Sequence, residues 1–373
     1  MPRLSKLCAF ASIVVLVPAA IAASGSGTVP GTWRKLRPAP LAVPQQTASV
    51  WTGRQLIVFG RRPITNPSID VAEAYDPARD AWSRLSPPAA PRSSLGYRAV
   101  WTEKEMLVFG AFHSVAFNPV TNKWRKLRHS VPGGITVWTG REAIGWGGGC
   151  CGDAESDGAA YNPATDAFRT LARSPLAPSQ APLGVWNGHE LILFVSSFGP
   201  DGKRWPARLA RAAAYRPLTN TWRRIAPLPV TGLRFTGTAV WDGREVVVVA
   251  SGANARSAFA YNPATNHWRR LASMPSARIG PTAVWTGTRL LLWGGQNLGA
   301  TRYLRDGLAY DPLTNRWSSL PAAPLGVRSS PVVAWTGHAL IVWGGEVGTP
   351  LGTTTPPRFP RDGAVFTPSG RRS

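Results

Sequence analysis

Short apolar runs, separated by glycine, proline and polar residues, recur along the whole chain. In one of the clearest stretches they cover residues 282–285, 289–293, 307–310 and 316–320. These runs are rich in β-branched and aromatic residues, which favours β-strands over helices. The sequence therefore predicts units of four short strands, with tight turns after the first and third strands and a longer loop after the second.

A second pattern has an aromatic residue, any residue and proline, followed by another aromatic residue seven positions after the first. Six complete copies are Tyr75 with Trp82, Phe117 with Trp124, Tyr161 with Phe168, Tyr215 with Trp222, Tyr261 with Trp268, and Tyr310 with Trp317. From Trp33 to Trp317 the mean period is about 47 residues, which is typical of solenoids and propellers. The chain is therefore expected to be a repeat protein.

The seventh copy is divided between the two ends of the chain. Phe366 lacks its partner near the C-terminus, and Trp33 is an unpaired aromatic of the same type. An open solenoid needs capping repeats and would not use one end to complete the other. We therefore predict an all-β, seven-bladed β-propeller of four-stranded blades over residues 33–368, closed by a strand at 33–36.

Tryptophan and glycine positions agree with this reading. Sixteen of the 17 tryptophans fall at repeat positions, where they are expected to wedge between blades, and Trp205 is the exception. Each first strand ends in tryptophan: Trp51, Trp101, Trp138, Trp186, Trp241, Trp285 and Trp335. In all copies except that of Trp101 a Thr-Gly, Asn-Gly or Asp-Gly pair follows, which supplies the positive φ of a two-residue hairpin.

The repeat resembles that of Kelch-repeat β-propellers, the architecture of the central domain of galactose oxidase. Glycine pairs at 147–148, 294–295 and 344–345, together with the spacing from tyrosine to tryptophan, support the resemblance. Four repeats lack the glycine pair, Phe117 and Phe366 replace tyrosine, and Phe168 replaces tryptophan. The resemblance implies the fold, whereas function depends on the site that a given chain builds on it.

The N-terminal residues are typical of an export signal. Arg3 and Lys6 precede an apolar run over 7–17 and a small-residue cleavage site at 20–22. We expect a cleaved signal peptide over 1–22, a flexible linker over 23–32, a C-terminal tail over 369–373 and a secreted or extracytoplasmic monomer. An uncleaved anchor is the alternative, although the apolar run is shorter than the roughly 20 residues of a membrane span.

The chain is strongly basic, with a net charge of +23. Ten basic residues follow the fourth-strand aromatics and are expected to protect the outer edges from pairing with other molecules: Arg34, Lys35, Arg84, Arg125, Lys126, Arg169, Arg223, Arg224, Arg269 and Arg270. The remaining positive charge would attract polyanions nonspecifically. Specific nucleic-acid recognition is not expected of an exported chain without a recognition helix.

Alternating strand direction gives the disc two different faces. The hairpin face contains the turns after first and third strands, which are short and repetitive. The loop face contains the connections between blades and the loops after second strands, which are long and varied at 147–158, 195–211, 296–306 and 346–362. Because function tends to lie in variable loops on a rigid scaffold, we expect the binding site on the loop face.

Candidate ligand-binding residues on the loop face are Arg234, Arg278 and Arg328, each seven residues before a first-strand tryptophan. Three guanidinium groups could converge on a carboxylate or sulfate. Alternatively, each arginine braces the neighbouring loops. Trp205 could face a ligand or cover its own loop.

Cys150 and Cys151 are adjacent and are the only cysteines beyond the leader. Their Cα atoms would be about 3.8 Å apart, below the usual disulfide range of roughly 4.4–6.8 Å. A strained vicinal disulfide is the first interpretation, because an exported protein meets oxidising conditions. Free thiols or an intermolecular bond come next, and metal ligation last.

The resemblance to galactose oxidase, which binds copper through tyrosine and histidine, raises His113, His129 and Tyr97 as possible ligands near the cysteine pair. A second copper-binding tyrosine is not evident, so we expect no cofactor and keep copper as the alternative. The predicted function is an exported module that binds carbohydrate, another anionic surface ligand or a protein.

The alternative function is an enzyme, either a galactose-oxidase-like copper oxidase or a carbohydrate isomerase or hydrolase of the sialate-processing type. A hydrolase would draw on acidic residues of the loop face. These are Asp153, Glu155, Asp157, Asp306, Glu346 and Asp362. The separations of their carboxylates do not follow from the sequence.

Overall fold

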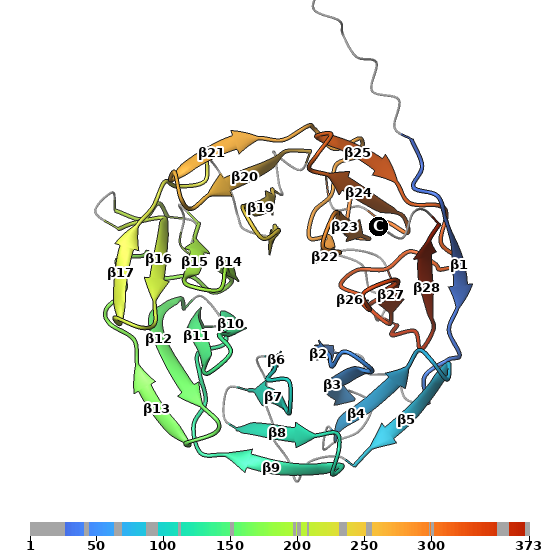
Figure 1. Cartoon of the computed structure of the whole chain (residues 1–373), viewed down its shortest axis with the longest axis horizontal. Helices are drawn as coiled ribbons and strands as arrows, with labels where there is room; N and C mark the ends of the chain where they lie inside the picture. The colour runs from blue at the N-terminus through green and yellow to red at the C-terminus, as the bar shows by residue number, and fades with distance from the viewer. Residues whose placement is uncertain are drawn as a thin grey trace, which may run out of the picture.

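The computed structural model is a ring of seven β-sheets (Figure 1). It describes residues 27–40, 45–62, 69–86, 96–110, 113–149, 153–196, 199, 203–206, 209–230, 237–250, 256–297, 299, 302–348 and 358–369. Every helix or strand assigned in these ranges is a β-strand, and they contain no helix that could span a membrane. The predicted all-β, seven-bladed propeller is confirmed.

Each blade is a four-stranded antiparallel sheet, and in Figure 1 its strands follow one another from the inside of the ring to its rim. Blade 1 consists of β2 (Gln45–Trp51), β3 (Leu56–Arg62), β4 (Ile69–Asp76) and β5 (Ala81–Leu85). Blade 2 consists of β6 (Arg98–Trp101), β7 (Met106–Phe109), β8 (Ser114–Asn118) and β9 (Lys123–Leu127). Blade 3 consists of β10 (Ile135–Trp138), β11 (Ala143–Gly148), β12 (Glu155–Asn162) and β13 (Ala167–Thr170). Blade 4 consists of β14 (Leu183–Trp186), β15 (Leu191–Phe194), β16 (Ala212–Arg216) and β17 (Thr221–Arg224). Blade 5 consists of β18 (Thr238–Trp241), β19 (Val246–Val249), β20 (Ala258–Asn262) and β21 (His267–Arg270). Blade 6 consists of β22 (Thr282–Trp285), β23 (Leu290–Trp293), β24 (Gly307–Asp311) and β25 (Arg316–Ser319). Blade 7 consists of β26 (Val332–Trp335), β27 (Leu340–Trp343), β28 (Gly363–Pro368) and β1 (Gly31–Lys35).

β1 closes the ring by pairing with β28, which confirms the predicted closure. Trp33 lies opposite Phe366, and the two ring centroids are 5.2 Å apart. The strand runs over 31–35 instead of the predicted 33–36. Part of the stretch predicted as a flexible linker is also held, because Thr28 bridges Ser319 of blade 6 in parallel and the Val29 amide donates to the Ser319 carbonyl at 2.9 Å.

The hydrophobic core lies between the blades. At the seam of blades 7 and 1, Ile341 and Trp343 pack with Val58 and Tyr75, and these four side chains are at most 1% exposed. In the described part of the chain, each of the six other seams between neighbouring blades contains a cluster of the same kind. The half-buried Trp51 packs against the first cluster, as predicted for a wedge between neighbouring blades.

Residues that tolerate positive φ occupy the tight turns of the hairpin face. Six of the first hairpins have glycine with φ between 88° and 97°, and the seventh has Glu103 at 68°. In six turns between the third and fourth strands, Asp or Asn has φ between 47° and 57°: Asp80, Asn122, Asp166, Asn220, Asn266 and Asn315. This repeated turn chemistry keeps the hairpin face short and regular.

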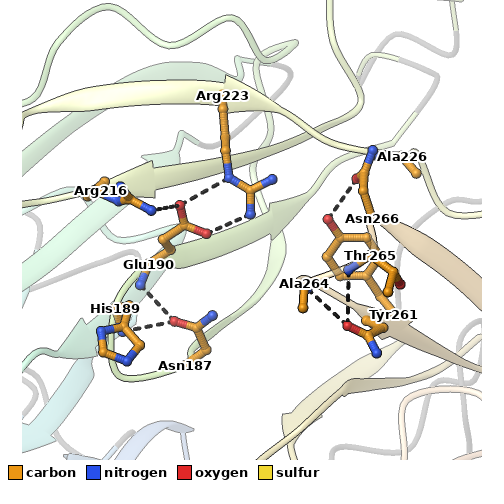
Figure 2. A network of polar contacts seen from close by, with 11 residues as sticks. Asn187, His189, Glu190, Arg216, Arg223, Ala226, Tyr261, Ala264, Thr265 and Asn266 are labelled. Atoms are coloured by element: carbon orange, nitrogen blue, oxygen red, sulfur yellow. Dashed lines mark hydrogen bonds and ion pairs between the residues drawn. The ribbon is translucent and has the colours of Figure 1, made fainter.

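The first arginine after the fourth-strand aromatic forms an ion pair in five blades. In blade 4, Arg223 donates to both carboxylate oxygens of Glu190, at 3.0 and 2.7 Å, and Arg216 adds a bond at 3.3 Å (Figure 2). The equivalent pairs are Arg125 with Glu105, Arg169 with Glu142, Arg269 with Glu245, and Arg34 with Asp80.

An acidic side chain of the hairpin face holds each of these five arginines, so they have a pairing role that the edge-protection prediction did not include. The next basic residue is exposed on the outer strand in every case where the repeat has one. These residues are Lys35, Arg84, Lys126, Arg224 and Arg270. For them, protection of the edge remains a prediction.

Polar contacts also join neighbouring blades. The Tyr261 hydroxyl donates to Asn266 Oδ1 at 2.8 Å, and the same oxygen accepts from the Ala226 amide of blade 4 at 2.9 Å (Figure 2). Trp268 Nε1 donates to the Ala226 carbonyl at 2.9 Å. Burial raises the pKa of Tyr261, so its hydroxyl stays protonated and able to donate. These bonds fix blade 5 against blade 4.

Candidate functional site

Arg278 and Arg328 each hold the loop after the second strand of their own blade. Arg278 is fully buried and donates to the Gly294 and Asp306 carbonyls, at 3.0 and 3.1 Å, and to the Asp306 carboxylate at 2.5 Å. Arg328 is 1% exposed and donates to the Asp362 carboxylate at 3.1 Å. The two guanidinium groups thus bind separate aspartates, as the bracing alternative expects.

The other two ligand candidates are placed differently. Trp205 is half-buried and packs against the core cluster of blades 3 and 4, which contains Leu176 and Ala210. This contact agrees with the alternative that Trp205 covers its own loop. Arg234 lies outside the described residues.

Blade 3 has the aspartate of the arginine brace but lacks the arginine. Asp157 precedes Gly158, which lies opposite Trp146, the same register that Gly307 has opposite Trp293 in blade 6. Val131 takes the sequence position of the bracing arginine. It is 4% exposed, and its side chain has no hydrogen-bond donor. Among the described residues nothing pairs with the Asp157 carboxylate, which is exposed. This carboxylate is therefore available to a ligand.

The seam between blades 2 and 3 also lacks a bond found at other seams. Five fourth-strand tryptophans donate Nε1–H to a carbonyl of the preceding blade: Trp33, Trp82, Trp222, Trp268 and Trp317. Phe168 of blade 3 has no such donor and is 40% exposed. It stacks on His129 with centroids 4.8 Å apart, and nearby Arg128 pairs with Asp166 at 3.1 Å.

A cavity of about 590 Å³ lies in this seam, and its lining includes Gly110, Gly133 and Gly149 from connections of the loop face. Arg98 and Phe109 of blade 2 line it from one side, and Glu155, Asp157 and Phe168 of blade 3 from the other. Several further lining residues are glycines, whose lack of side chains leaves the space open. Cavities of roughly 300–1,000 Å³ are typical of small-molecule sites. We call this space the seam cavity.

The seam cavity contains charged groups of both signs. Glu155 and Asp157 both lie on β12 and line the cavity, in a stretch where the register between β12 and β11 is irregular. Arg98, at the start of β6, donates to the Tyr97 carbonyl at 3.2 Å. Although solvent reaches the Arg98 side chain, the surrounding protein lowers its pKa by desolvation, and the guanidinium still remains charged.

Within the described ranges of the chain, no ion pair joins these three groups to each other or to another residue. Carboxylates accept hydrogen bonds from hydroxyl and ammonium groups, and a guanidinium donates them. The two phenylalanines add apolar surface. The cavity is therefore suited to a polar ligand that also has an apolar face.

Of the three residues suggested as copper ligands, only the two histidines share a hollow. His113 and His129 line a second hollow of about 280 Å³, but Tyr97 does not. Tyr97 is 2% exposed and donates to Asp70 Oδ1 at 2.9 Å. In the described part of the chain no three His, Cys, Asp or Glu side chains are placed to share a metal ion. These residues therefore do not fit the copper site implied by the resemblance.

Cys150 and Cys151 lie outside the described residues, so their pairing stays a prediction. Sequence reasoning missed Arg98 and Phe109 as site residues and named Glu155 and Asp157 only among six loop-face acids. Two departures from the repeat are visible in the sequence and fall in this one seam. Phe168 replaces the usual tryptophan, and Asp157, which precedes Gly158, lacks the arginine that braces the equivalent aspartates Asp306 and Asp362.

Comparisons with known proteins bear on the fold. The sequence model of the Kelch motif family matches residues 277–324, which contain all of blade 6. The comparison with curated proteins gave no match.

Among solved structures, a fungal alcohol oxidase of the AA5 family, in complex with copper, matches with a TM-score of 0.69 and 13% identity. The match covers 91% of this chain and 76% of that one. At this identity it shows a shared fold and nothing about activity. The aromatic repeat, the seven blades and these matches together show a seven-bladed β-propeller that contains a Kelch motif over residues 277–324 and shares its fold with this AA5 oxidase.

Proposed function

We propose that this protein is an exported binding module that holds a carbohydrate in the seam cavity. The observation that supports this most directly is one cavity lined by Arg98, Glu155 and Asp157, none of them paired with another charged group of the described residues. Charged side chains gain stability when they are paired, so groups left free around a cavity favour a ligand that supplies the missing bonds.

A sugar fits these walls chemically. Its hydroxyl groups donate to the carboxylates of Glu155 and Asp157, and Arg98 donates to ring or hydroxyl oxygens, or to the carboxylate of an acidic sugar. The exposed face of Phe168 packs against the apolar C–H face of the ring. The local charge of the cavity is close to balanced, unlike the chain as a whole, whose net charge is +23.

The test is a glycan binding screen at about 0.1 M and about 0.5 M salt, because long-range attraction is strongly screened at the higher value. For a glycan bound at both concentrations, we expect Arg98→Gln and Asp157→Asn each to weaken binding about tenfold, as loss of a charged hydrogen bond predicts. Matched controls are Arg141→Gln and Glu103→Gln, exposed residues of the hairpin face.

Equal weakening by the hairpin-face controls, or binding to polyanions alone that disappears at high salt, would reject the seam cavity as the site. A hydrolase is the second candidate, because two carboxylates line the same cavity. For that candidate, the glycan that binds would be cleaved by the wild-type protein and left intact by Asp157→Asn.

A further inference from the structure

Three large apolar side chains protrude from the hairpin face. Val120, Leu218 and Leu313 are 91%, 92% and 93% exposed. Each occupies the same position of the turn between the third and fourth strands, in blades 2, 4 and 6. Blades 1, 3 and 5 have alanine there: Ala78, Ala164 and Ala264.

Each apolar tip has a basic residue within three positions. Lys123 follows Val120, Arg216 precedes Leu218 and Arg316 follows Leu313. All three basic side chains are exposed, and Arg216 is 56% exposed even though it contacts Glu190. Four carboxylates of this face are already bound by arginines: Glu105, Glu142, Glu190 and Glu245. Their negative charge is therefore largely neutralised.

The N-terminal segment enters the propeller at the same face. Gly31 lies opposite Pro368, at the hairpin-face end of β28. Gly27 lines a small hollow with Thr314 and Arg316, in the turn that contains the Leu313 tip. In the alternative in which the leader is not cleaved, its apolar run over 7–17 precedes a segment that meets the ring at the face with the apolar tips.

We infer that the hairpin face docks on an anionic lipid bilayer. The apolar tips enter the boundary between headgroups and acyl chains, and the neighbouring basic side chains bind lipid phosphates. Single exposed apolar residues are common on soluble proteins, but three at one repeat position, on one face and each beside a cation, fit an amphipathic surface. A soluble polyanion would use the cations and leave Leu218 and Leu313 in water.

This orientation directs the loop face and the seam cavity away from the membrane. The inference rests on the turns and their charges, and it stands whether or not the seam cavity binds a sugar.

The test measures sedimentation of the full-length chain with phosphatidylglycerol–phosphatidylcholine vesicles. We expect the triple variant Val120→Ala, Leu218→Ala and Leu313→Ala to bind at least tenfold more weakly than wild type. Alanine at the same turn position in three blades shows that the fold accepts the change. The matched control is Val327→Ala, which removes an apolar side chain that is 40% exposed in the connection between blades 6 and 7, on the loop face.

A charge series tests the basic part of the surface. Near an anionic membrane each Lys or Arg is worth roughly a fivefold change in binding. Lys123→Gln and Arg316→Gln should each weaken binding by about that factor, whereas Arg305→Gln on the loop face should not. Vesicles of phosphatidylcholine alone should bind less than the mixed vesicles.

The leader is present in every variant, so differences between variants report on the turns. A second measurement, hydrogen exchange with vesicles present, should show slower exchange at 118–122, 216–220 and 311–315. Binding of the triple variant within twofold of wild type would overturn the inference. Protection limited to the loop face, or the same protection produced by a soluble polyanion, would also overturn it.

Discussion

At the scale of single residues, Glu190 connects two strands of blade 4. Its carboxylate receives two hydrogen bonds from Arg223 of β17 and one from Arg216 of β16. The bonds from Arg223 are the main cause of a lowered pKa at Glu190. The side chain is only 7% exposed, whereas that of Arg223 is 40% exposed, so solvent screens part of this interaction.

We predict that Glu190→Gln lowers the free energy of unfolding by about 1–3 kcal/mol at neutral pH, the usual range for a hydrogen bond to a charged group. Because the folded pKa lies below the ordinary value of 4.5, the stabilisation is complete above that value and is lost as pH falls through the folded pKa. Urea unfolding of both proteins, from neutral to acidic pH, measures the difference.

The difference between wild type and Glu190→Gln should therefore shrink in acid. A difference that stays constant over the whole pH range would show that the carboxylate charge does not stabilise the blade. Asp242→Asn would not be a clean control, because its Oδ1 accepts two backbone amide bonds in its own hairpin. Glu103→Gln is a better control, since Glu103 is exposed and its carboxylate pairs with no other described residue.

At the scale of elements, the connection between blades 2 and 3 shows where a glycine is required. A Cβ on Gly134 would lie 2.6 Å from backbone atoms of Trp146, Gly147 and Gly148, which cannot move aside like a flexible side chain. A Cβ on the preceding Gly133 would meet no atom within 4 Å. Two adjacent glycines thus differ sharply in the space around them.

We predict that Gly134→Ala destabilises the protein by about 1–3 kcal/mol through overpacking, whereas Gly133→Ala changes stability by less than about 0.5 kcal/mol. Thermal unfolding of the two variants beside the wild type measures this. Equal melting temperatures for the two variants would show that the connection moves freely against β11 and does not form a fixed wall of the seam cavity.

The sequence predicts the elements well because each has its own local signal. Each first strand ends at its tryptophan, and the turns contain glycine or the Asp and Asn residues with positive φ. The role of an arginine is harder to predict, because its partner is distant in sequence. Arg223 and Glu190 are 33 residues apart, and Arg278 and Asp306 are 28 apart. Only the register of the strands brings such pairs together.

The seam cavity could be predicted even less. The cavity arises where side chains typical of the repeat are missing. Phe168 is smaller than the usual tryptophan, and no arginine from its own blade pairs with Asp157. Such departures are visible in the sequence. Whether they leave a cavity depends on how two blades pack, which the sequence of either blade alone does not specify.

At the scale of the whole molecule, stability depends on closing the ring. Trp33 packs on Phe366 and donates Nε1–H to the Pro321 carbonyl at 2.9 Å, so one side chain contacts both blade 7 and the segment after blade 6. We predict that Trp33→Ala lowers the free energy of unfolding by about 2–4 kcal/mol, somewhat below the usual cost of removing a fully buried tryptophan. Denaturant unfolding followed by tryptophan fluorescence measures the loss.

Phe168→Ala is the matched control, because Phe168 holds the same repeat position in blade 3 but is 40% exposed and has no N–H donor. Its loss should be about 1 kcal/mol, consistent with a partly exposed side chain. Similar losses in the two variants would mean that the closing strand is no more important than any other outer strand.

The pairing of β1 with β28 and of Thr28 with Ser319 has a consequence for biosynthesis. The ribosome makes residues 28–35 before the blades that separate them in sequence from their partners at 319 and 364–368. Throughout translation this segment must stay unpaired, with Trp33 unshielded, while the intervening blades assemble. A nascent polypeptide stopped before Gly363 has no β28 and cannot complete the circle, so we expect quality-control proteases to recognise such fragments.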